Sequence, residues 1–456
     1  MLRVLVGIVS AVAVLVGAVL GGVTVTMRDS YSAGGGSGPF SGGWPVPRSA
    51  PAGATVVAVL LGTDGTVVSD ALLPYEAFAR DSHFFVYTVA AERRPTPLSG
   101  GLGVVPEHTF DTAPSPDVVV VPAVVRQEPQ LRDWLRGQAS RGAYLLGVCA
   151  GAEVLADAGL LAGRRATSFW QRLGGLRDSH PDTTWLAGER FVEDGRIITT
   201  AGVTSGLAGS LRLIELLAGP DVATRVGREV SYHDWAPRTL THIPERSLVV
   251  GDLPYALNAA FPRLRPTIGI GLTDGVGEID LAAAFETYAG TSFAARTVPV
   301  ATQPTVTTRH GLLLTADLMP VDRLIVPGVD RPGSGTAIWA ADRHIDITLP
   351  HAGRKPGEFA FDPLLRDLAE HTDRATARTT AKFTEYPVDH LMLTGAAWPW
   401  RSTVIAVLVL GAAVGAGVLP TWVARRRRRR MHSPVLGLGP ATTHASADAR
   451  SPSLPG

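Results

Sequence analysis

Two long segments without a charged side chain, one near each end, set the strongest limit on how this chain folds. Residues 4–27 and 402–424 contain no Asp, Glu, Lys or Arg. A helix that crosses a bilayer needs roughly 20 residues, and each segment is about that long. Because a segment in lipid must satisfy its own backbone hydrogen bonds, both are predicted to be transmembrane helices.

Basic residues flank the two segments on their outer sides. Arg3 precedes the first, and residues 425–430 are six consecutive arginines after the second. Basic residues beside a span mark its cytoplasmic side, which predicts a double-pass cell-membrane protein with cytoplasmic termini and an extracytoplasmic soluble region. Two alternatives stay open: a cleaved signal peptide at the N-terminus, and an arginine patch for acidic lipid or nucleic acid.

Charge and cysteine content narrow the function of the region between the spans. The net charge of the chain is +1, and much of its positive charge lies in the arginine run. The soluble region is therefore near neutral, and no nucleic-acid partner is expected. Cys149 is the sole cysteine, so no internal disulfide can form. Such a cysteine is either a reactive group or a small buried hydrophobe.

Apolar segments between the spans alternate with amphipathic ones. Strands are predicted at residues 55–62, 84–90, 117–123, 144–148 and 196–202, and helices at 69–80, 129–140, 150–161 and 205–219. Strands that are apolar throughout belong to a parallel sheet that is covered by helices on both faces. The predicted class is therefore α/β.

The pattern then repeats. TVVAVLLGTDGTVVSDALLPYEAF (55–78) and PTIGIGLTDGVGEIDLAAAFETY (266–288) share a strand, an Asp-Gly loop, an acid and a helix. DVVVVPAV (117–124) and DRLIVPGV (322–329) follow at matching places. This predicts a second, degenerate α/β half-domain that lacks a counterpart of GVCAG and in which Asp280 is structural. Coincidence of generic α/β patterning is the alternative.

These patterns divide the chain into consecutive parts. They are an N-terminal transmembrane helix (1–27), a flexible linker (28–53), the main α/β domain (54–235), a linker (236–264), the degenerate half-domain (265–390), a second transmembrane helix (402–424) and a basic, disordered cytoplasmic tail (425–456).

The turn GVCAG, within YLLGVCAGAEVLADAGLL (144–161), carries the clearest chemical signal. A strand runs directly into a helix there, and small neighbours leave room for a strained backbone at Cys149. The thiol would lie above the carboxyl edge of the sheet, at a helix N-terminus that favours the thiolate. The amide of Ala150 would point at a developing oxyanion.

Several motifs occur in a characteristic order. They are DALLPYEAFA (70–79), GLGVVPEHTF (101–110), GVCAGAEVLADAGLLAGRRATSFW (147–170) and FVEDGRIITTAGVTSG (191–206). The chain resembles the DJ-1/PfpI (class I glutamine-amidotransferase-like) superfamily over about residues 55–235, and most closely its branch of isonitrile hydratases and AraC-type regulators. The resemblance implies a flavodoxin-like parallel sheet between helices.

The resemblance also assigns roles to residues. Cys149 falls on the nucleophile, and Asp70 on the acid that hydrogen-bonds the thiol; in isonitrile hydratases these two form the catalytic pair. The amides of Ala150 and Val124 fall on the oxyanion donors. The alternatives are an inert Cys149 and an Asp70 that serves only as a helix N-cap or first-turn acid.

Three departures weaken a catalytic assignment. Phe169 occupies the place where the branch often has histidine, β-branched Val124 replaces a glycine, and Ala208 replaces an aspartate. A cysteine–histidine pair needs a base within reach, and phenylalanine is none. Other histidines that could substitute are His108, His180 and His233.

Two function classes follow. The favoured one is a cysteine-dependent hydratase, hydrolase or lyase acting on an unknown small molecule outside the membrane; the alternative is a non-catalytic ligand-binding sensor or scaffold. A transcription regulator is excluded because no helix-turn-helix follows, and glutamine amidotransferase activity is disfavoured.

No cofactor or metal is expected, since metal and nucleotide motifs are absent. The lipid bilayer is the expected partner, and a homodimer or an intramolecular pairing of the halves is left open.

Overall fold

The computed structural model describes residues 2–32, 43–232, 235–236 and 241–431. It consists of two compact units: residues 17–408 form a folded body, and residues 1–16 together with 409–456 form a second unit. The body contains both α/β halves, and the second unit contains the outer parts of the two long apolar helices.

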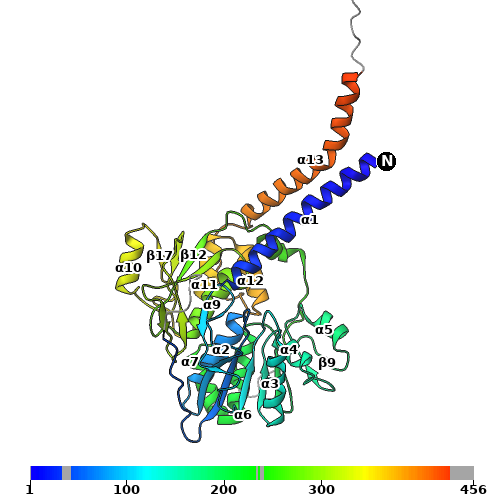
Figure 1. The fold of residues 1–456 in the computed structure, drawn as a ribbon. Coiled ribbons are helices and arrows are strands. Elements are labelled where there is room, and N and C mark those ends of the chain that lie inside the picture. Colours follow the sequence, from blue (N-terminus) through cyan, green and yellow to red (C-terminus); the bar gives the residue numbers. More distant parts are fainter. Residues whose placement is uncertain (1, 33–42, 233–234, 237–240, 432–456) are drawn as a thin grey trace, which may run out of the picture. The chain divides into compact units, whose positions relative to one another are not determined.

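The main sheet of the body has seven strands in the order β10-β11-β7-β6-β1-β2-β5. Its strands run from blue through cyan to green in Figure 1. Their bounds are β1 Thr55–Leu61, β2 Phe84–Ala90, β5 His108–Thr109, β6 Val118–Val121, β7 Tyr144–Gly147, β10 Phe191–Asp194 and β11 Ile197–Thr200. All neighbours pair in parallel except β10 and β11, which are antiparallel. The parallel sheet predicted from the apolar strands is thus confirmed, with an added antiparallel edge.

Helices cover both faces of this sheet, as the apolar strands require. The helices of the first half are α2 Val68–Ala79, α3 Pro129–Ser140, α4 Gly151–Asp157, α5 Leu173–Ser179, α6 Ser205–Ala218 and α7 Pro220–Glu229. Leucines of α3 and α4 pack in one hydrophobic cluster, while α2 and α6 pack in the other. From Val68 to Phe78 every residue of α2 is buried, because the second half covers its outer side.

A second sheet has the order β13-β12-β16-β17 and is parallel throughout. Its strands are β12 Thr267–Gly271, β13 Arg296–Val300, β16 Arg323–Ile325 and β17 Ile347–Thr348, and helix α9 (Glu278–Phe285) follows β12. This order repeats β2-β1-β6-β7 of the main sheet. The strand that the repeated pattern predicts at residues 266–271 is therefore observed, in the expected parallel setting.

A third sheet joins the two halves. Strands β3 (Thr96–Pro97) and β4 (Gly103–Val105) come from the first half, and β14 (Thr305–Thr307) and β15 (Leu313–Thr315) from the second. β15 pairs antiparallel with β4. The packing of α2 on α9 adds a second contact. The two halves are consequently parts of one folded body.

The structure differs from the sequence prediction in both linkers. Residues 236–264 contain helix α8 (Leu253–Ala260), which packs on α12 (Arg374–Phe383) through its apolar side. In the N-terminal linker, residues 33–42 lie outside the described residues. Beyond them Arg48 is anchored, because its guanidinium donates to Glu107 at 2.8 Å and to the Val86 carbonyl at 2.7 Å.

Two helices are long and apolar enough to cross a membrane. They are α1 (Leu2–Tyr31) and α13 (Trp400–Met431), with apolar stretches at Leu5–Tyr31 and Trp400–Leu419. Gly7 and Gly417 meet so closely that a Cβ on Gly7 would overlap the Gly417 carbonyl. Close backbone approach through small residues is typical of helix pairs in lipid. Length, composition and this contact all fit membrane helices.

The inner end of α1 belongs to the folded body. Thr26 is fully buried, and its hydroxyl donates to the Ala259 carbonyl at 2.9 Å. Asp29 pairs with Arg265 at 2.5 Å. Helix α1 thus extends past residue 27, where the sequence predicted its end, because polar side chains in its last turns bond to the body.

The turn between β7 and α4 should tolerate no side chain at Gly151. A Cβ there would overlap the carbonyl of Val121, and that backbone cannot move without disturbing β6. Gly151→Ala is expected to lower the free energy of unfolding by about 3 kcal/mol or more. The control is Gly137→Ala in α3, where the nearest atom is an arginine tip at 4.0 Å. It should stabilise slightly, by about 0.5–1 kcal/mol. Urea denaturation of the detergent-solubilised chain would measure both; equal effects would contradict the prediction.

Candidate functional site

Cys149 lies at the junction of β7 and α4 with φ at 57°, a left-handed conformation that is rare for a residue with a side chain. The close contact of Gly151 with the Val121 carbonyl pins the turn on one side. On the other side, the Ser168 hydroxyl donates to the Cys149 carbonyl at 2.8 Å. The structure therefore has the strained elbow that the sequence predicts.

Asp70 lies in the first turn of α2 and is fully buried. Its Oδ2 accepts a hydrogen bond from the Ala123 amide at 3.1 Å, its Oδ1 has no hydrogen-bond partner within the described residues, and the nearby Cys149 thiol acts to lower its pKa. The N-cap residue of α2 is Val67. The Asp70 side chain thus extends toward the turn that contains Cys149. It does not cap helix α2.

Burial controls the protonation of both groups. It raises the pKa of the Asp70 carboxyl well above its usual value, against the opposing hydrogen bond from Ala123. Burial, and then the nearby Asp70 charge, raise the pKa of the Cys149 thiol, although the amides of Ala150 and Val203 bond the sulfur and oppose the rise. The amide at the helix terminus thus favours the thiolate, as expected, but desolvation outweighs it, and the net effect is a raised thiol pKa.

A second carboxyl group interacts electrostatically with the thiol, and no sequence motif indicates it. Glu385 follows α12 in the second half, has φ at 54° and is buried. It accepts hydrogen bonds from the Ser205 hydroxyl at 2.9 Å and from the Gly202 amide. Burial raises the pKa of Glu385 to about 7, and its charge acts on both Cys149 and Asp70. No motif or spacing connects it to the elbow.

The remaining predicted residues take other positions. Val124 forms an isolated bridge with Thr66, and among the described residues the sulfur is bonded by the Val203 amide, not by that of Val124. Phe169 packs beside Trp170 and Phe383 with ring centroids 5.5 and 6.3 Å away. The role of the Val124 amide as an oxyanion donor therefore stays a prediction, while Val203 is an additional amide that acts on the sulfur.

Of the candidate histidines, the two that the structure describes, His108 and His180, have partners away from Cys149. His108 lies edge-on to Tyr87, with centroids 4.9 Å apart. His180 pairs with Asp157 at 3.1 Å, and His233 lies outside the described residues. Ala208 is buried in α6. Within the described part of the chain, the carboxyls of Asp70 and Glu385 and the phenol of Tyr31 interact electrostatically with Cys149.

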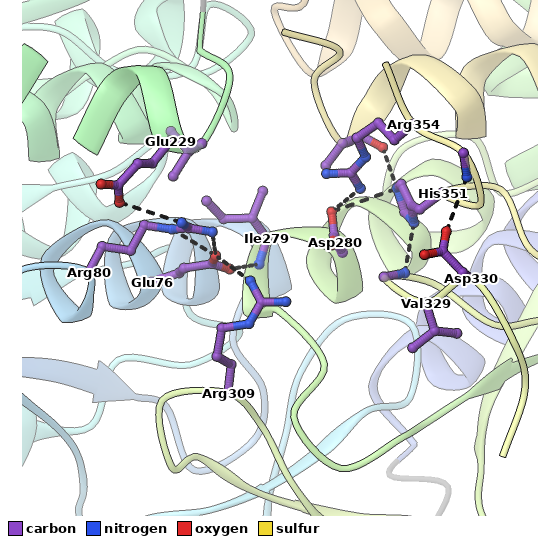
Figure 2. Close-up of a pocket in the computed structure, with 14 residues that line it drawn as sticks. Glu76, Arg80, Glu229, Ile279, Asp280, Arg309, Val329, Asp330, His351 and Arg354 are labelled. Carbon is purple, nitrogen blue, oxygen red and sulfur yellow. Dashed lines mark hydrogen bonds and ion pairs between the residues drawn. The ribbon is translucent and has the colours of Figure 1, made fainter. Parts of the chain in front are cut away.

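Two cavities lie at the sheet edges. One of about 140 Å³ is lined by Trp170, Arg177 and Arg246, and also by Ser168 and Glu385, which both interact with Cys149. Cys149 itself is 7% exposed and is not among the residues that line this cavity. A larger cavity of about 500 Å³ lies at the edge of the second sheet (Figure 2).

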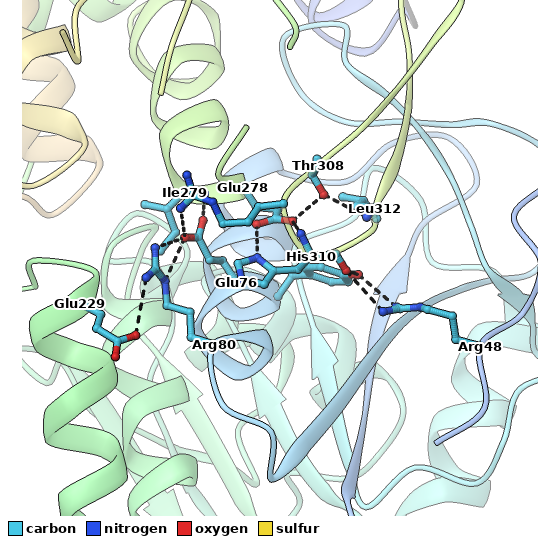
Figure 3. A network of polar contacts seen from close by, with 11 residues as sticks. Arg48, Glu76, Arg80, Glu229, Glu278, Ile279, Thr308, His310 and Leu312 are labelled. Carbon is cyan, nitrogen blue, oxygen red and sulfur yellow. Dashed lines mark hydrogen bonds and ion pairs between the residues drawn. The ribbon is translucent and has the colours of Figure 1, made fainter. Parts of the chain in front are cut away.

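One cluster has ligand atoms close enough for a metal ion. Glu76, Glu278 and His310 place theirs within 4.8 Å of one another (Figure 3). Glu278 already accepts from Thr308 and lies 2.7 Å from His310 Nδ1, and Glu76 accepts from Arg80 at 2.5 Å. These atoms are used within the chain, and the adjacent guanidinium opposes a cation. The cluster is best described as a buried ion-pair network.

Comparison with known proteins agrees with this geometry. A sequence model of the DJ-1/PfpI family matches residues 55–216. The isonitrile hydratase of Pseudomonas putida is 33% identical over 165 residues, which cover 35% of this chain and 71% of that enzyme. This chain belongs to the DJ-1/PfpI family.

Other DJ-1/PfpI relatives differ in function. The HTH-type transcriptional regulator CdhR of Pseudomonas aeruginosa is 33% identical over 147 residues, 31% of this chain and 44% of the regulator. Among solved structures, a ThiJ/PfpI family protein from Pseudomonas syringae is 28% identical, covers 41% of this chain and 78% of its own, and has a TM-score of 0.37. The similar proteins thus include an isonitrile hydratase and an HTH-type transcriptional regulator.

The contact between Asp70 and the thiol predicts an ordered set of reactivities. Asp70→Asn keeps an acceptor for the Ala123 amide and a donor for the sulfur, so the rate of iodoacetamide alkylation should stay near wild type. Burial favours the protonated, uncharged form of Asp70, so Asp70→Ala removes a hydrogen-bond donor rather than a negative charge. It should therefore raise the thiol pKa and slow alkylation. Asp178→Asn, an exposed carboxyl on α5, is the matched control. The measurement is the alkylation rate between about pH 6 and pH 10 by mass spectrometry. Identical profiles for all variants would show that Asp70 does not act on Cys149.

Proposed function

We propose that this chain is a membrane-anchored, cysteine-dependent hydratase of small uncharged molecules with an electrophilic carbon, of the isonitrile type. The observation that carries the proposal is one strained thiol with two buried carboxyl groups of different acidity. Burial raises the pKa of Asp70 well above its usual value, which favours its protonated form, while Glu385, with a pKa of about 7, is partly ionised at neutral pH. A site with one acid and one base at neutral pH suits addition of water.

The proposed reaction conserves atoms and electrons. The Cys149 sulfur bonds to the terminal carbon of R–N≡C, and the thiol proton passes through Asp70 to that carbon, which gives a thioimidate. Ionised Glu385 takes a proton from water as the C–O bond forms, and this proton ends on nitrogen. The C–S bond then breaks, the hydroxyl proton returns to sulfur, and R–NH–CHO leaves. The amides of Ala150 and Val203 stabilise negative charge on the sulfur as it leaves.

Catalysis by Glu385 predicts a pH dependence with a definite sign. The base must be ionised, so the turnover rate on a small alkyl isonitrile should rise with pH through about 7, the pKa of Glu385. Glu385→Gln should lower kcat by about 100-fold or more and abolish this rise. Cys149→Ala should remove activity, and the exposed control Glu370→Gln should leave it unchanged. Formamide formation is the readout; a Glu385→Gln enzyme with the wild-type profile would exclude this role.

A non-catalytic sensor is the second candidate, favoured by the way the site is closed. Tyr31, the last residue of α1, packs against Gly65 and lies in the electrostatic environment of Asp70 and Cys149. Glu385 belongs to the segment that leads to α13. Ligand entry would therefore move groups attached to both membrane helices. Binding of an isonitrile without turnover by the wild-type chain would favour the sensor.

We propose further that both termini lie in the cytoplasm and the folded body outside it. Arginines on the outer flank of each apolar helix support this orientation. A C-terminal fusion to a reporter that is active only in the cytoplasm should be active, and a fusion to one active only outside should not. N-terminal sequencing of the mature chain tests whether the first helix is retained. An external C-terminus, or a cleaved N-terminus, would contradict this topology.

A further inference from the structure

The larger cavity lies where parallel α/β sheets place their ligands. It has a volume of about 500 Å³, within the usual range for small-molecule sites, and lies at the carboxyl ends of β12, β16 and β17. One wall is formed by Arg309 and, from the first half, by Glu76, Arg80 and Glu229. The other wall contains Asp280, Asp330, His351 and Arg354 (Figure 2).

Strand register shows that this cavity occupies the place of the Cys149 site in the second half. Val119 pairs with Leu145 in the main sheet, and its counterpart Leu324 pairs with Ile347 in the second. Four residues beyond these partners stand Cys149 and His351 (145 + 4 and 347 + 4). In the same way Asp280 is the third residue of α9, as Asp70 is of α2.

The nucleophile has thus been replaced by a histidine that is fully bonded. His351 Nδ1 accepts from the Gly328 amide at 2.9 Å, and its Nε2 lies 3.0 Å from the Ala360 carbonyl, to which it donates. Burial lowers the pKa of His351, which keeps the ring neutral. Asp280 pairs with Arg354. This edge has lost covalent chemistry and kept a polar, enclosed surface.

Most charges that line the cavity neutralise one another. Arg80 pairs with Glu76 and Arg354 with Asp280, and Glu229 accepts from Arg225 at 2.8 Å. Two charges remain. Arg309 is 45% exposed, and its nearest carboxylate oxygen, on Glu76, is 3.9 Å away.

Asp330 is the second remaining charge. It accepts from the Gly353 amide at 3.1 Å, and within the described residues no cation pairs with it. Figure 2 shows Arg309 and Asp330 on different sides of the cavity, so that it presents one guanidinium and one carboxylate at separate places.

We propose that this cavity binds a small zwitterion of the amino-acid type. Its carboxylate would accept from the Arg309 guanidinium, and its ammonium group would donate to Asp330. Arg80 and Arg354 would line the space between without giving up their own partners. The site is separate from Cys149 and does not depend on the function proposed there.

Isothermal titration of the full-length chain in detergent micelles tests this inference. The probes are glycine, L-alanine and L-serine, with acetate and methylammonium as half-ligands. At least one amino acid should bind. Each half-ligand should bind at least about tenfold more weakly, since it makes only one of the two charge contacts. No binding by any of the three amino acids, or acetate binding as tightly as they do, would overturn the proposal.

Matched variants locate the site. Arg309→Gln and Asp330→Asn should each weaken amino-acid binding about tenfold or more. The asparagine can still accept from the Gly353 amide, so the loop should keep its fold. Arg132→Gln in α3 and Cys149→Ala should bind like wild type. Unchanged affinity in Arg309→Gln or Asp330→Asn, or loss of binding in Cys149→Ala, would overturn the assignment; the last result would place the ligand at the thiol instead.

Discussion

The burial of helix α2 on all sides is the constraint on which the rest of the structure depends. The main sheet and α6 cover one side of it, and α9 of the second half covers the other. Each polar group of α2 must therefore find a partner inside the protein, since an unpaired buried group is costly. Asp70 bonds to the elbow, Ser69 donates to Glu286 at 2.8 Å, and Glu76 accepts from the first turn of α9. Helix α2 thus contributes Asp70 to the Cys149 site and Glu76 to the larger cavity. Its packing on α9 also connects the two halves.

Much of this arrangement could be predicted from the sequence, where local patterns determine structure. The strand–turn–helix around Cys149, the first-turn position of Asp70 and the repeated strand at residues 266–271 all depend on short segments. Glu385 and Val203 could not be found this way, because tertiary packing alone brings them to the sulfur. The raised pKa of the Cys149 thiol could not be found for the same reason: the motif determines the helix end, but the covering segments determine how much water is lost. Helix α8 was missed because LPYALNAA is short and was taken as part of a linker.

Several carboxyl groups share the low-dielectric region around α2. Burial raises the pKa of Glu286 and of Glu385 to about 7, and that of Asp70 and Glu76 above their usual values. A raised pKa means that the folded state holds a proton which the unfolded chain has released. Such groups favour the fold at acidic pH, and this contribution is lost as pH rises from the ordinary carboxyl range through about 7. Near neutral pH, the burial of these carboxyl groups therefore lowers the stability of the fold. The same burial places groups that can transfer protons beside a thiol.

The pairing of β15 with β4 within one chain has a consequence for how the two sites can change. In a symmetric homodimer every substitution appears twice, so both copies of a site are altered together. Here the two related edges are encoded separately, and they are held in a fixed one-to-one ratio at any concentration. One edge can keep a thiol while the other exchanges it for histidine and arginine. Because the two halves belong to one chain, their sites can diverge independently. The halves also cannot separate by dissociation.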